Sequence, residues 1–217
     1  MQRRQLLTLL AGLPVLASGA SLSDLEAEAA RRRAAYRDEL RRLARETPVA
    51  IYDNPLDPVL GPAAATRSVL VFTDYNCPYC RKLDPVIAQL AGRADAPARF
   101  VLKLLTIMDP GSALASAFAL RVWQQQPRQF SAAHHALMTG PLPLTTAALK
   151  QIARQSGTQA SLAEADAAAA TLTATQQLAQ RLQVYATPSL LIGARIMSGM
   201  TDAATLRQEI VRWPMEA

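Results

Sequence analysis

The fold is decided by the stretch SVLVFTDYNCPYCRKL, residues 68–83. Its first five residues form an apolar, β-branched run of the kind found in a buried central strand. A short polar turn follows, and the sequence CPYC then opens a predicted helix that continues to about residue 91, with apolar residues at helical spacing. The stretch therefore predicts a strand, a tight turn and a helix whose first turn carries both cysteines.

The rest of the chain predicts an α/β protein in which strands flank a block of helices. Residues 98–105 form a second strand-like run, whereas residues 51–65, rich in Pro, Asn, Asp and Gly, are expected to be a loop. Helical patterns then lie near 112–125, 128–138, 145–156, 160–165 and 166–183. A strand at 187–193, a hairpin partner at 195–198 and a helix at 201–213 follow. The predicted order is β-α-β, a helical block, then β-β-α.

The chemistry is expected at Cys77 and Cys80, the only two cysteines of the chain. Unpaired backbone N–H groups and the helix dipole at a helix N-terminus favour negative charge, so a cysteine there is stabilised as its thiolate. Cys77 is therefore predicted to be the exposed nucleophile, and Cys80, one turn further on, the buried resolving thiol. Pro78 suits the first helical turn because its missing N–H has no partner to lose there.

The cysteine pair could also serve roles other than redox chemistry. A structural disulfide across so short a loop would stabilise almost nothing. Zinc needs two further ligands, and the two histidines, His134 and His135, are adjacent, so on a helix they point about 100° apart, one packed and one solvated. Copper(I) can be held by two thiolates alone, so a copper chaperone using Cys77 and Cys80 is an alternative function.

Length and composition limit the class of protein further. The 217 residues suit one domain with a short appendage. Only 18% of the residues are charged and the net charge is +6, which does not fit a disordered tail protein. No run of Lys and Arg interleaved with aromatic residues is present, so nucleic acid is not an expected partner.

Residues 1–20 are predicted to be a cleavable export signal. Met1–Arg4 is basic, residues 6–16 are mostly apolar, and residues 17–20, ASGA, form a small-residue cleavage site. The pair Arg3-Arg4 also resembles a twin-arginine signal, so either the Sec or the twin-arginine route is open; the alternative is an uncleaved anchor. The signal predicts a periplasmic protein in an oxidising compartment.

Residues 21–47 are predicted to form an exposed amphipathic helix. Ser23 can cap it, with Glu26 at capping-box spacing. Oppositely charged residues sit four apart at Glu28 and Arg32 and at Asp38 and Arg42. This helix either docks on the domain that follows or serves for oligomerisation.

Residues 72–83 resemble the active site of the bacterial Dsb thiol:disulfide oxidoreductases, which have the thioredoxin fold. The sequence FTDYNCPYCRKL is similar to the active-site sequence of the DsbC and DsbG isomerases. Residues 57–61, the 130–138 segment around His134 and the loop 186–189 resemble the DsbA family in its Com1- and ScsC-like branch. The resemblance implies an α/β, thioredoxin-like fold over residues 48–217, with a helical insertion at about 110–183, preceded by the N-terminal helix.

The resemblance also implies roles for individual residues. Cys77 and Cys80 would be the catalytic pair, and Pro188, preceded by Thr187, would be a cis-proline facing them. Substrate would contact Thr187, Pro188, Pro78 and Tyr79. One departure concerns Val71, which stands six residues before the nucleophile, where thioredoxin and DsbA carry a buried carboxylate. Asp74 is expected to cap the turn before Cys77 rather than to act in catalysis.

The expected function is a periplasmic thiol:disulfide oxidoreductase that forms or exchanges disulfides in secreted proteins, without cofactor or metal. Dithiol oxidase and disulfide isomerase are both open, the isomerase requiring an oligomer built through residues 21–47. The expected partners are unfolded or partly folded exported proteins, a membrane redox partner and a second copy of the chain.

Overall fold

The computed structural model describes residues 21–46, 51–163 and 166–213. It divides into two units, residues 1–36 and 37–217. The predicted signal at 1–20 lies outside the described residues. None of the helices within the described ranges combines the length and apolar character that crossing a membrane requires.

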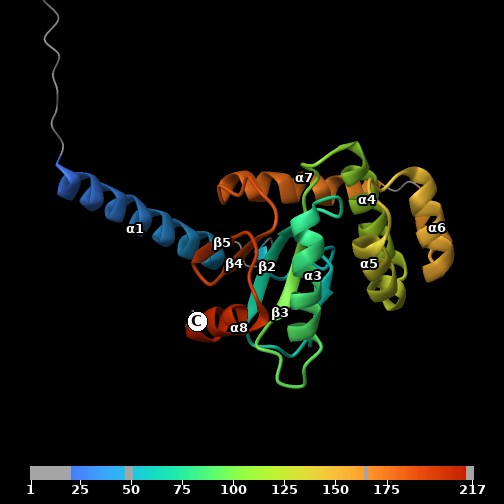
Figure 1. Ribbon diagram of the computed structural model, residues 1–217, viewed down its shortest axis with the longest axis horizontal. Coiled ribbons are helices and arrows are strands. Elements are labelled where there is room, and N and C mark those ends of the chain that lie inside the picture. The colour runs from blue at the N-terminus through green and yellow to red at the C-terminus, as the bar shows by residue number, and fades with distance from the viewer. Residues whose placement is uncertain (1–20, 47–50, 164–165, 214–217) are drawn as a thin grey trace, which may run out of the picture. The chain divides into compact units, whose positions relative to one another are not determined.

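The second unit is built on a five-stranded mixed sheet with β2 at its centre (Figure 1). β2 and β3 run parallel, β1 pairs antiparallel with β3, β4 antiparallel with β2, and β5 antiparallel with β4. The strand order is therefore β1-β3-β2-β4-β5. The strands are β1 (Val59–Leu60), β2 (Ser68–Thr73), β3 (Arg99–Leu104), β4 (Ser189–Ile192) and β5 (Arg195–Ser198).

The helices confirm the predicted order of elements. Figure 1 shows α4, α5 and α6 gathered on one side, beyond α3. They are α3 (Pro78–Ala91), α4 (Pro110–Gln125), α5 (Phe130–Thr139), α6 (Thr146–Ser156), α7 (Asp166–Arg181) and α8 (Ala203–Arg212), with 3-10 turns η1 (Pro127–Gln129) and η2 (Gln159–Leu162).

Two sequence predictions in this unit are wrong in detail. In the described part of the segment 160–165, which was predicted as a helix and is described up to residue 163, the structure has the 3-10 turn η2, Gln159–Leu162. The loop predicted over 51–65 contains β1, because Val59 and Leu60 pair with Val101 and Phe100 of β3. Two residues are too few to show a periodic pattern, so only pairing with a distant strand defines them as β-structure.

Alternation along β2 places apolar side chains on both faces of the sheet. Val69 and Val71 belong to one hydrophobic cluster with Leu83 of α3. Leu70 and Phe72 are fully buried but point to the other face. A central strand buried on both sides explains why its sequence is continuously apolar, and the helix that follows it starts from a rigid support.

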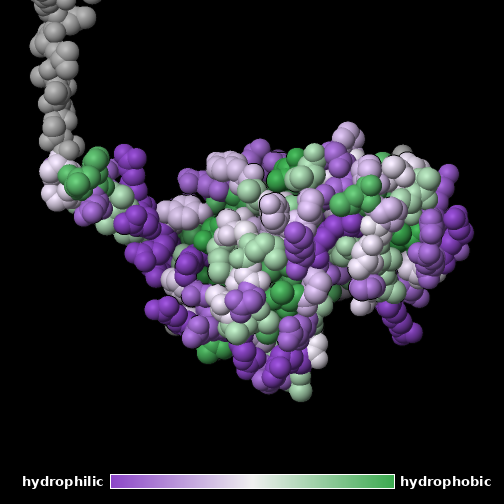
Figure 2. All heavy atoms as spheres, viewed as in Figure 1, coloured by the Kyte–Doolittle hydropathy of each residue, from purple (hydrophilic) through white to green (hydrophobic). Residues whose placement is uncertain are grey.

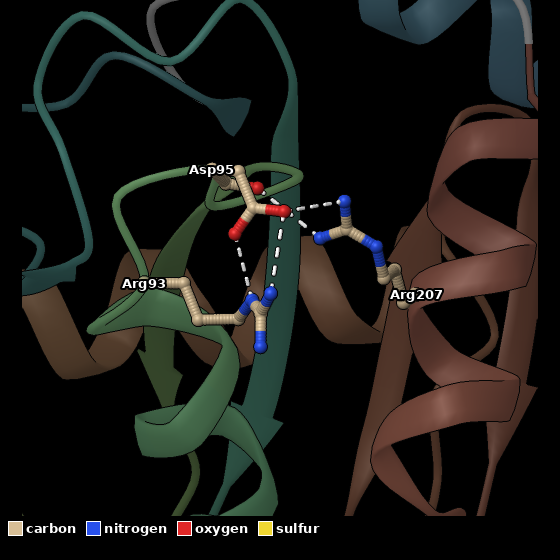
Figure 3. A network of polar contacts seen from close by, with 3 residues as sticks. All are labelled: Arg93, Asp95 and Arg207. Carbon is tan, nitrogen blue, oxygen red and sulfur yellow. Dashed lines mark hydrogen bonds and ion pairs between the residues drawn. The ribbon is translucent and has the colours of Figure 1, made fainter.

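The far end of α3 is tied to α8 by a small ionic network (Figure 3). Asp95, in the turn after α3, accepts hydrogen bonds from Arg93 Nε at 2.7 Å and from Arg207 of α8 at 2.9 Å. Arg207 also donates to the Asp95 carbonyl at 3.1 Å. Arg93 and Asp95 are exposed and Arg207 is half-buried, so this network lies at the surface, away from the cysteines at the start of α3.

The N-terminal helix α1 (Leu22–Glu46) confirms the predicted helix, but its cap differs. The Ser21 backbone N–H donates to Asp24 Oδ2 at 3.0 Å, and the Asp24 N–H donates to Ser21 Oγ at 3.2 Å. The predicted cap, Ser23 with Glu26, is wrong because the helix begins before Ser23, which then lies inside the first turn.

The charge pairs along α1 are also only partly as predicted. Glu28 and Arg32 pair at 2.7 Å, as expected. Asp38 pairs instead with Arg41 at 3.1 Å, because both i+3 and i+4 neighbours are within reach on a helix surface. Arg42, the predicted partner of Asp38, bridges two glutamates, Glu39 at 2.6 Å and Glu46 at 2.7 Å.

Candidate active site

Both cysteines lie at the N-terminus of α3, as reduced thiols. Cys77 is the N-cap residue, in an extended conformation, and Pro78 occupies the first turn as predicted. The Arg81 N–H donates to the Cys77 carbonyl at 3.1 Å, which closes the first turn around Cys80. The two sulfur-bearing residues therefore share one helical turn, where a disulfide ring can close between them.

Cys77 faces the loop that carries the predicted cis-proline. The Thr187–Pro188 peptide bond is cis, as the resemblance implied. Cys77 Sγ donates to the Thr187 carbonyl oxygen at 3.4 Å, across 110 residues of sequence. The structure thus brings Cys77, Thr187 and Pro188 together at one place.

The prediction that Cys77 is exposed is wrong. Cys77 is 2% exposed, as is Cys80, whereas the neighbouring Tyr79 is 58% exposed. The cause is tertiary: the Thr187 loop lies against the N-cap residue, which no local pattern reports. Pro78 and Tyr79 are the exposed residues of CPYC, so they are the part of the motif that a partner meets first.

Cys80 is buried behind Cys77, as predicted. Its sulfur accepts a hydrogen bond from the Asp74 backbone N–H at 3.4 Å. Burial raises the pKa of Cys80 to about 12, and the neighbouring Cys77 adds to the rise, while hydrogen bonds from Thr73, Asp74 and Thr187 oppose it. Cys80 therefore stays protonated at neutral pH.

Asp74 caps the turn before the cysteines, as expected, and does more than that. Its side chain, fully buried, accepts from the Asn76 N–H at 2.9 Å and from the Ser112 hydroxyl at 2.7 Å. Two further backbone N–H groups, of Ile107 and Met108, donate to it at 2.9 and 3.1 Å. Four donors satisfy the carboxylate, so Asp74 joins the turn, the loop after β3 and the start of α4.

Asn76 makes a second connection from the same turn. Its side-chain amide donates to Asp109 Oδ1 at 2.7 Å, and its side-chain oxygen accepts from the Leu144 N–H at 3.1 Å. Gly111 permits this close approach, because a Cβ there would lie 2.6 Å from the Leu144 carbonyl oxygen. A second cis peptide bond, Leu142–Pro143, which no sequence pattern indicates, lies in the loop that contains Leu144.

A buried polar cluster also went unpredicted beside the active-site helix. The Tyr75 hydroxyl lies 2.8 Å from His134 Nδ1, and His134 Nε2 lies 2.8 Å from Asp84 Oδ1. His134 is buried and His135 is exposed, which confirms the predicted division between the two histidines. Burial, with the nearby Asp84, raises the pKa of Tyr75 well above its usual value.

A buried ion pair between Asp57 and Lys103 lies at β3, beside the central strand. Lys103 is paired in register with Phe72 of β2, and both charged side chains are 2% exposed. Burial raises the pKa of Asp57, and Lys103 opposes the rise. The sequence signal was a single lysine within the apolar run 98–105. At the position six before Cys77, Val71 is buried and apolar.

No cluster of three His, Cys, Asp or Glu side chains suited to a metal ion occurs within residues 21–46, 51–163 and 166–213. The arrangement that the structure does provide is a dithiol at a helix N-terminus, opposite a cis-proline, on a sheet with a parallel pair at its centre. This is the site of a thioredoxin-like thiol:disulfide oxidoreductase.

Comparison with known proteins agrees with this class. The thioredoxin family model matches residues 53–211, and the chain belongs to that family. Among solved structures, the catalytic domain of Proteus mirabilis ScsC is 28% identical, with a TM-score of 0.74, over 78% of this chain and 96% of that one. No curated protein matches the chain.

Two further solved structures are similar. A periplasmic thioredoxin-like protein of Salmonella enterica serovar Typhimurium is 29% identical, with a TM-score of 0.71, over 75% of this chain and 92% of that one. A thioredoxin-like oxidoreductase of Silicibacter pomeroyi is 30% identical, with a TM-score of 0.69, over 76% and 95%. The chain is thus a DsbA- and ScsC-like thiol:disulfide oxidoreductase, as the sequence predicted.

Proposed function

We propose that the protein is a periplasmic oxidoreductase that forms or exchanges disulfides in exported proteins through Cys77 and Cys80. The observation that carries the proposal is the asymmetry of the two thiols. Cys77 is the N-cap residue of α3, against the Thr187 carbonyl, whereas the pKa of Cys80 is raised to about 12 by burial. Cys77 is thereby the sulfur that forms the mixed disulfide with substrate, and Cys80 is the resolving sulfur.

The proposed reaction conserves electrons and protons in two exchanges. A substrate thiolate attacks Cys77 of the Cys77–Cys80 disulfide, forming a mixed disulfide and releasing Cys80, which takes up a proton. A second thiolate of the same substrate then attacks the substrate sulfur that is bonded to Cys77. This closes the substrate disulfide and releases Cys77 as a thiolate. Two electrons pass from substrate to the pair, and a membrane redox partner would remove them.

Exposed apolar residues around the site support unfolded polypeptide as the substrate. We call this set the apolar rim: Tyr79 belongs to the CPYC motif, Tyr185 lies two residues before Thr187, and the other members lie in loops bonded to active-site residues. Ile107 and Met108 bond to Asp74 through their N–H groups, and Gly199, which precedes Met200, bonds to the Pro188 carbonyl. Between 41% and 76% exposed, the rim comprises Tyr79, Ile107, Met108, Leu142, Tyr185 and Met200. Large apolar side chains exposed together mark an interaction surface.

The Cys80→Ala variant tests the reaction. Without Cys80, the mixed disulfide between Cys77 and an exported protein cannot be resolved from the enzyme side, so adducts should accumulate in periplasmic extracts and vanish on reduction. The matched control is Cys77→Ala, which should form no such adduct. Normal copper(I) loading without trapped adducts would overturn the proposal in favour of the copper-chaperone alternative.

The isomerase alternative needs two active sites that face one substrate, so we propose α1 as the contact between copies of the chain. Leu22 and Leu25 are 80% and 56% exposed on α1, and Figure 2 shows hydrophobic and strongly hydrophilic residues side by side on the first part of this helix. Light scattering of the chain after signal removal, compared with a Leu22→Lys, Leu25→Lys variant, tests this. A mass equal to one chain in both proteins would contradict it.

A further inference from the structure

Three buried polar side chains beside the active site have no part in the exchange reaction described above. Tyr75 lies in the loop before α3, Asp84 in the second turn of α3, and His134 on α5 of the helical insertion. They are 0%, 8% and 4% exposed. The imidazole bridges the other two at 2.8 Å on each side, and Phe130 stacks on its face.

The hydrogen bonds fix the protonation of this cluster. Among the described residues, His134 Nδ1 is the only hydrogen-bond partner of the Tyr75 hydroxyl. A buried hydroxyl donates its proton where it can, so Nδ1 must be the acceptor. Nε2 then carries the ring hydrogen and donates it to Asp84, which accepts as a carboxylate. The ring is neutral and the cluster carries one negative charge, on Asp84.

This charge lies on the same helix as the reactive sulfurs. Asp84 follows Cys80 by four residues, one turn further along the same face of α3. From Cys77 it is seven residues away, or roughly 10 Å along the helix axis. Arg81, the charged residue between them that also reaches α5, has its guanidinium against the Leu137 carbonyl oxygen. A negative charge at this position opposes the stabilisation that the helix N-terminus gives to a thiolate.

We propose that Tyr75 and His134 are positioning residues that hold a negatively charged Asp84 behind Cys77, and that this charge makes the Cys77–Cys80 disulfide a weaker oxidant. The proposal rests on the redox role given to the pair above. Reduction adds two electrons and breaks the sulfur–sulfur bond; Cys80 takes up a proton, and Cys77 is the sulfur whose thiolate the helix N-terminus favours. Only the reduced form carries the thiolate, so the Asp84 charge disfavours reduction.

The equilibrium between the full chain and glutathione tests the proposal. In Asp84→Asn, the amide oxygen still accepts from His134 Nε2, but the charge is gone. The equilibrium constant for reduction of the Cys77–Cys80 disulfide should rise roughly tenfold, as expected for a unit charge at about this distance near a protein surface. A value within twofold of wild type in a folded variant would overturn the proposal.

Control variants separate electrostatics from structure. Asp84→Ala removes the same charge together with the hydrogen bond and should shift the equilibrium in the same direction. Asp95→Asn removes an exposed carboxylate beyond the end of α3, and His135→Gln changes the exposed neighbour of His134; both should stay within twofold of wild type. Lower stability in the Asp84 variants, with an unmoved equilibrium constant, would assign the cluster a merely structural role.

An independent measurement on the wild-type chain tests the hydrogen-bond assignment. The chain contains only two histidines, so its imidazole nitrogen signals are few. Nitrogen-15 chemical shifts at pH 7 should show one ring as the Nε2–H tautomer and the other, His135, averaged between tautomers. An imidazolium or an Nδ1–H tautomer at His134 would overturn the assignment, even if every Asp84 variant failed to fold.

The glutathione experiment also separates this inference from the proposed function. If the wild-type cysteine pair does not exchange with glutathione, the proposed function itself fails. If the pair exchanges but removing the Asp84 charge does not shift its equilibrium, only the role of the cluster fails.

Discussion

The thioredoxin-like core and the helical insertion contribute to the active site in different ways. The core supplies the two reacting sulfurs at the start of α3 and the Thr187 carbonyl that contacts Cys77. The insertion holds the residues just before those atoms through hydrogen bonds: the Ser112 hydroxyl donates to Asp74, and His134 Nδ1 accepts from the Tyr75 hydroxyl. The reacting sulfurs therefore lie within one short segment at the start of α3. The position of that segment depends on residues far along the chain.

The largest expected effect concerns the thioredoxin-like core: the rate at which Cys80 displaces a thiol bound to Cys77 should depend strongly on pH. Below a pKa of about 12, the thiolate fraction of Cys80 increases tenfold with each pH unit, and so should the rate at which Cys80 displaces a Cys77-bound thiol. The measurement is release of glutathione from a Cys77 mixed disulfide between pH 6 and 9.

The matched control for this prediction is Cys80→Ala, which should form the same glutathione adduct and retain it. A release rate that stays constant across the range would show that Cys80 is already ionised, or that another step limits the reaction. An already ionised Cys80 would remove the distinction between Cys77 as the thiol that contacts substrate and Cys80 as the protonated resolving thiol.

Among the residues that the helical insertion contacts, Asp74 should cause the largest loss of stability when it is changed to Asn. The amide cannot accept all four of the hydrogen bonds that Asp74 receives. Leaving buried donors unpaired costs about 1–3 kcal/mol each, so we expect the free energy of unfolding to fall by about 3 kcal/mol. Urea unfolding measures it. Asp38→Asn, an exposed residue of α1, is the control, and an equal loss there would contradict the role given to Asp74.

The local features of the site can be predicted from the sequence, whereas its long-range polar contacts cannot. The strand, the helix and the place of the cysteines follow from patterns within residues 68–91, and Pro188 from a motif that resembles a known family. The contacts of Asn76 with Leu144 and of Tyr75 with His134 join residues 68 and 59 positions apart. Hydrophobic periodicity says which face of an element is buried, not which polar groups meet there.

The burial of Cys77 does not follow from the local sequence for the same reason. A helix N-terminus predicts a favourable place for a thiolate, but exposure depends on the loop at Thr187, 110 residues away. The family resemblance did place Thr187 and Pro188 opposite Cys77, yet the distance between them is a property of the packed fold.

A smaller loss is expected where the insertion approaches the turn most closely. In Gly111→Ala, the added Cβ would lie 2.6 Å from the Leu144 carbonyl oxygen, so the loop must shift and loosen the Asn76–Leu144 hydrogen bond. Overpacking of this kind costs about 1–3 kcal/mol. Thermal unfolding measures it, with Gly92→Ala as the control, since a Cβ there comes no closer than 3.2 Å. Equal losses of stability in both variants would mean that the loop accommodates the added Cβ of Gly111→Ala at little cost, which would contradict this prediction.

The smallest effect is expected at Asp95, which touches neither contribution to the site (Figure 3). Hydrogen bonding from Arg93 lowers the pKa of Asp95, so any stabilisation by its ion pairs exists above the ordinary aspartate pKa and disappears as the pH falls through the lowered value. Exposed pairs of this kind contribute little and are screened by salt. Asp95→Asn should therefore leave the thiol exchange rate unchanged and alter the melting temperature least among these variants, with any difference vanishing in high salt. A changed exchange rate would mean that the far end of α3 also positions the cysteines, and the division between core and insertion would then have to include α8.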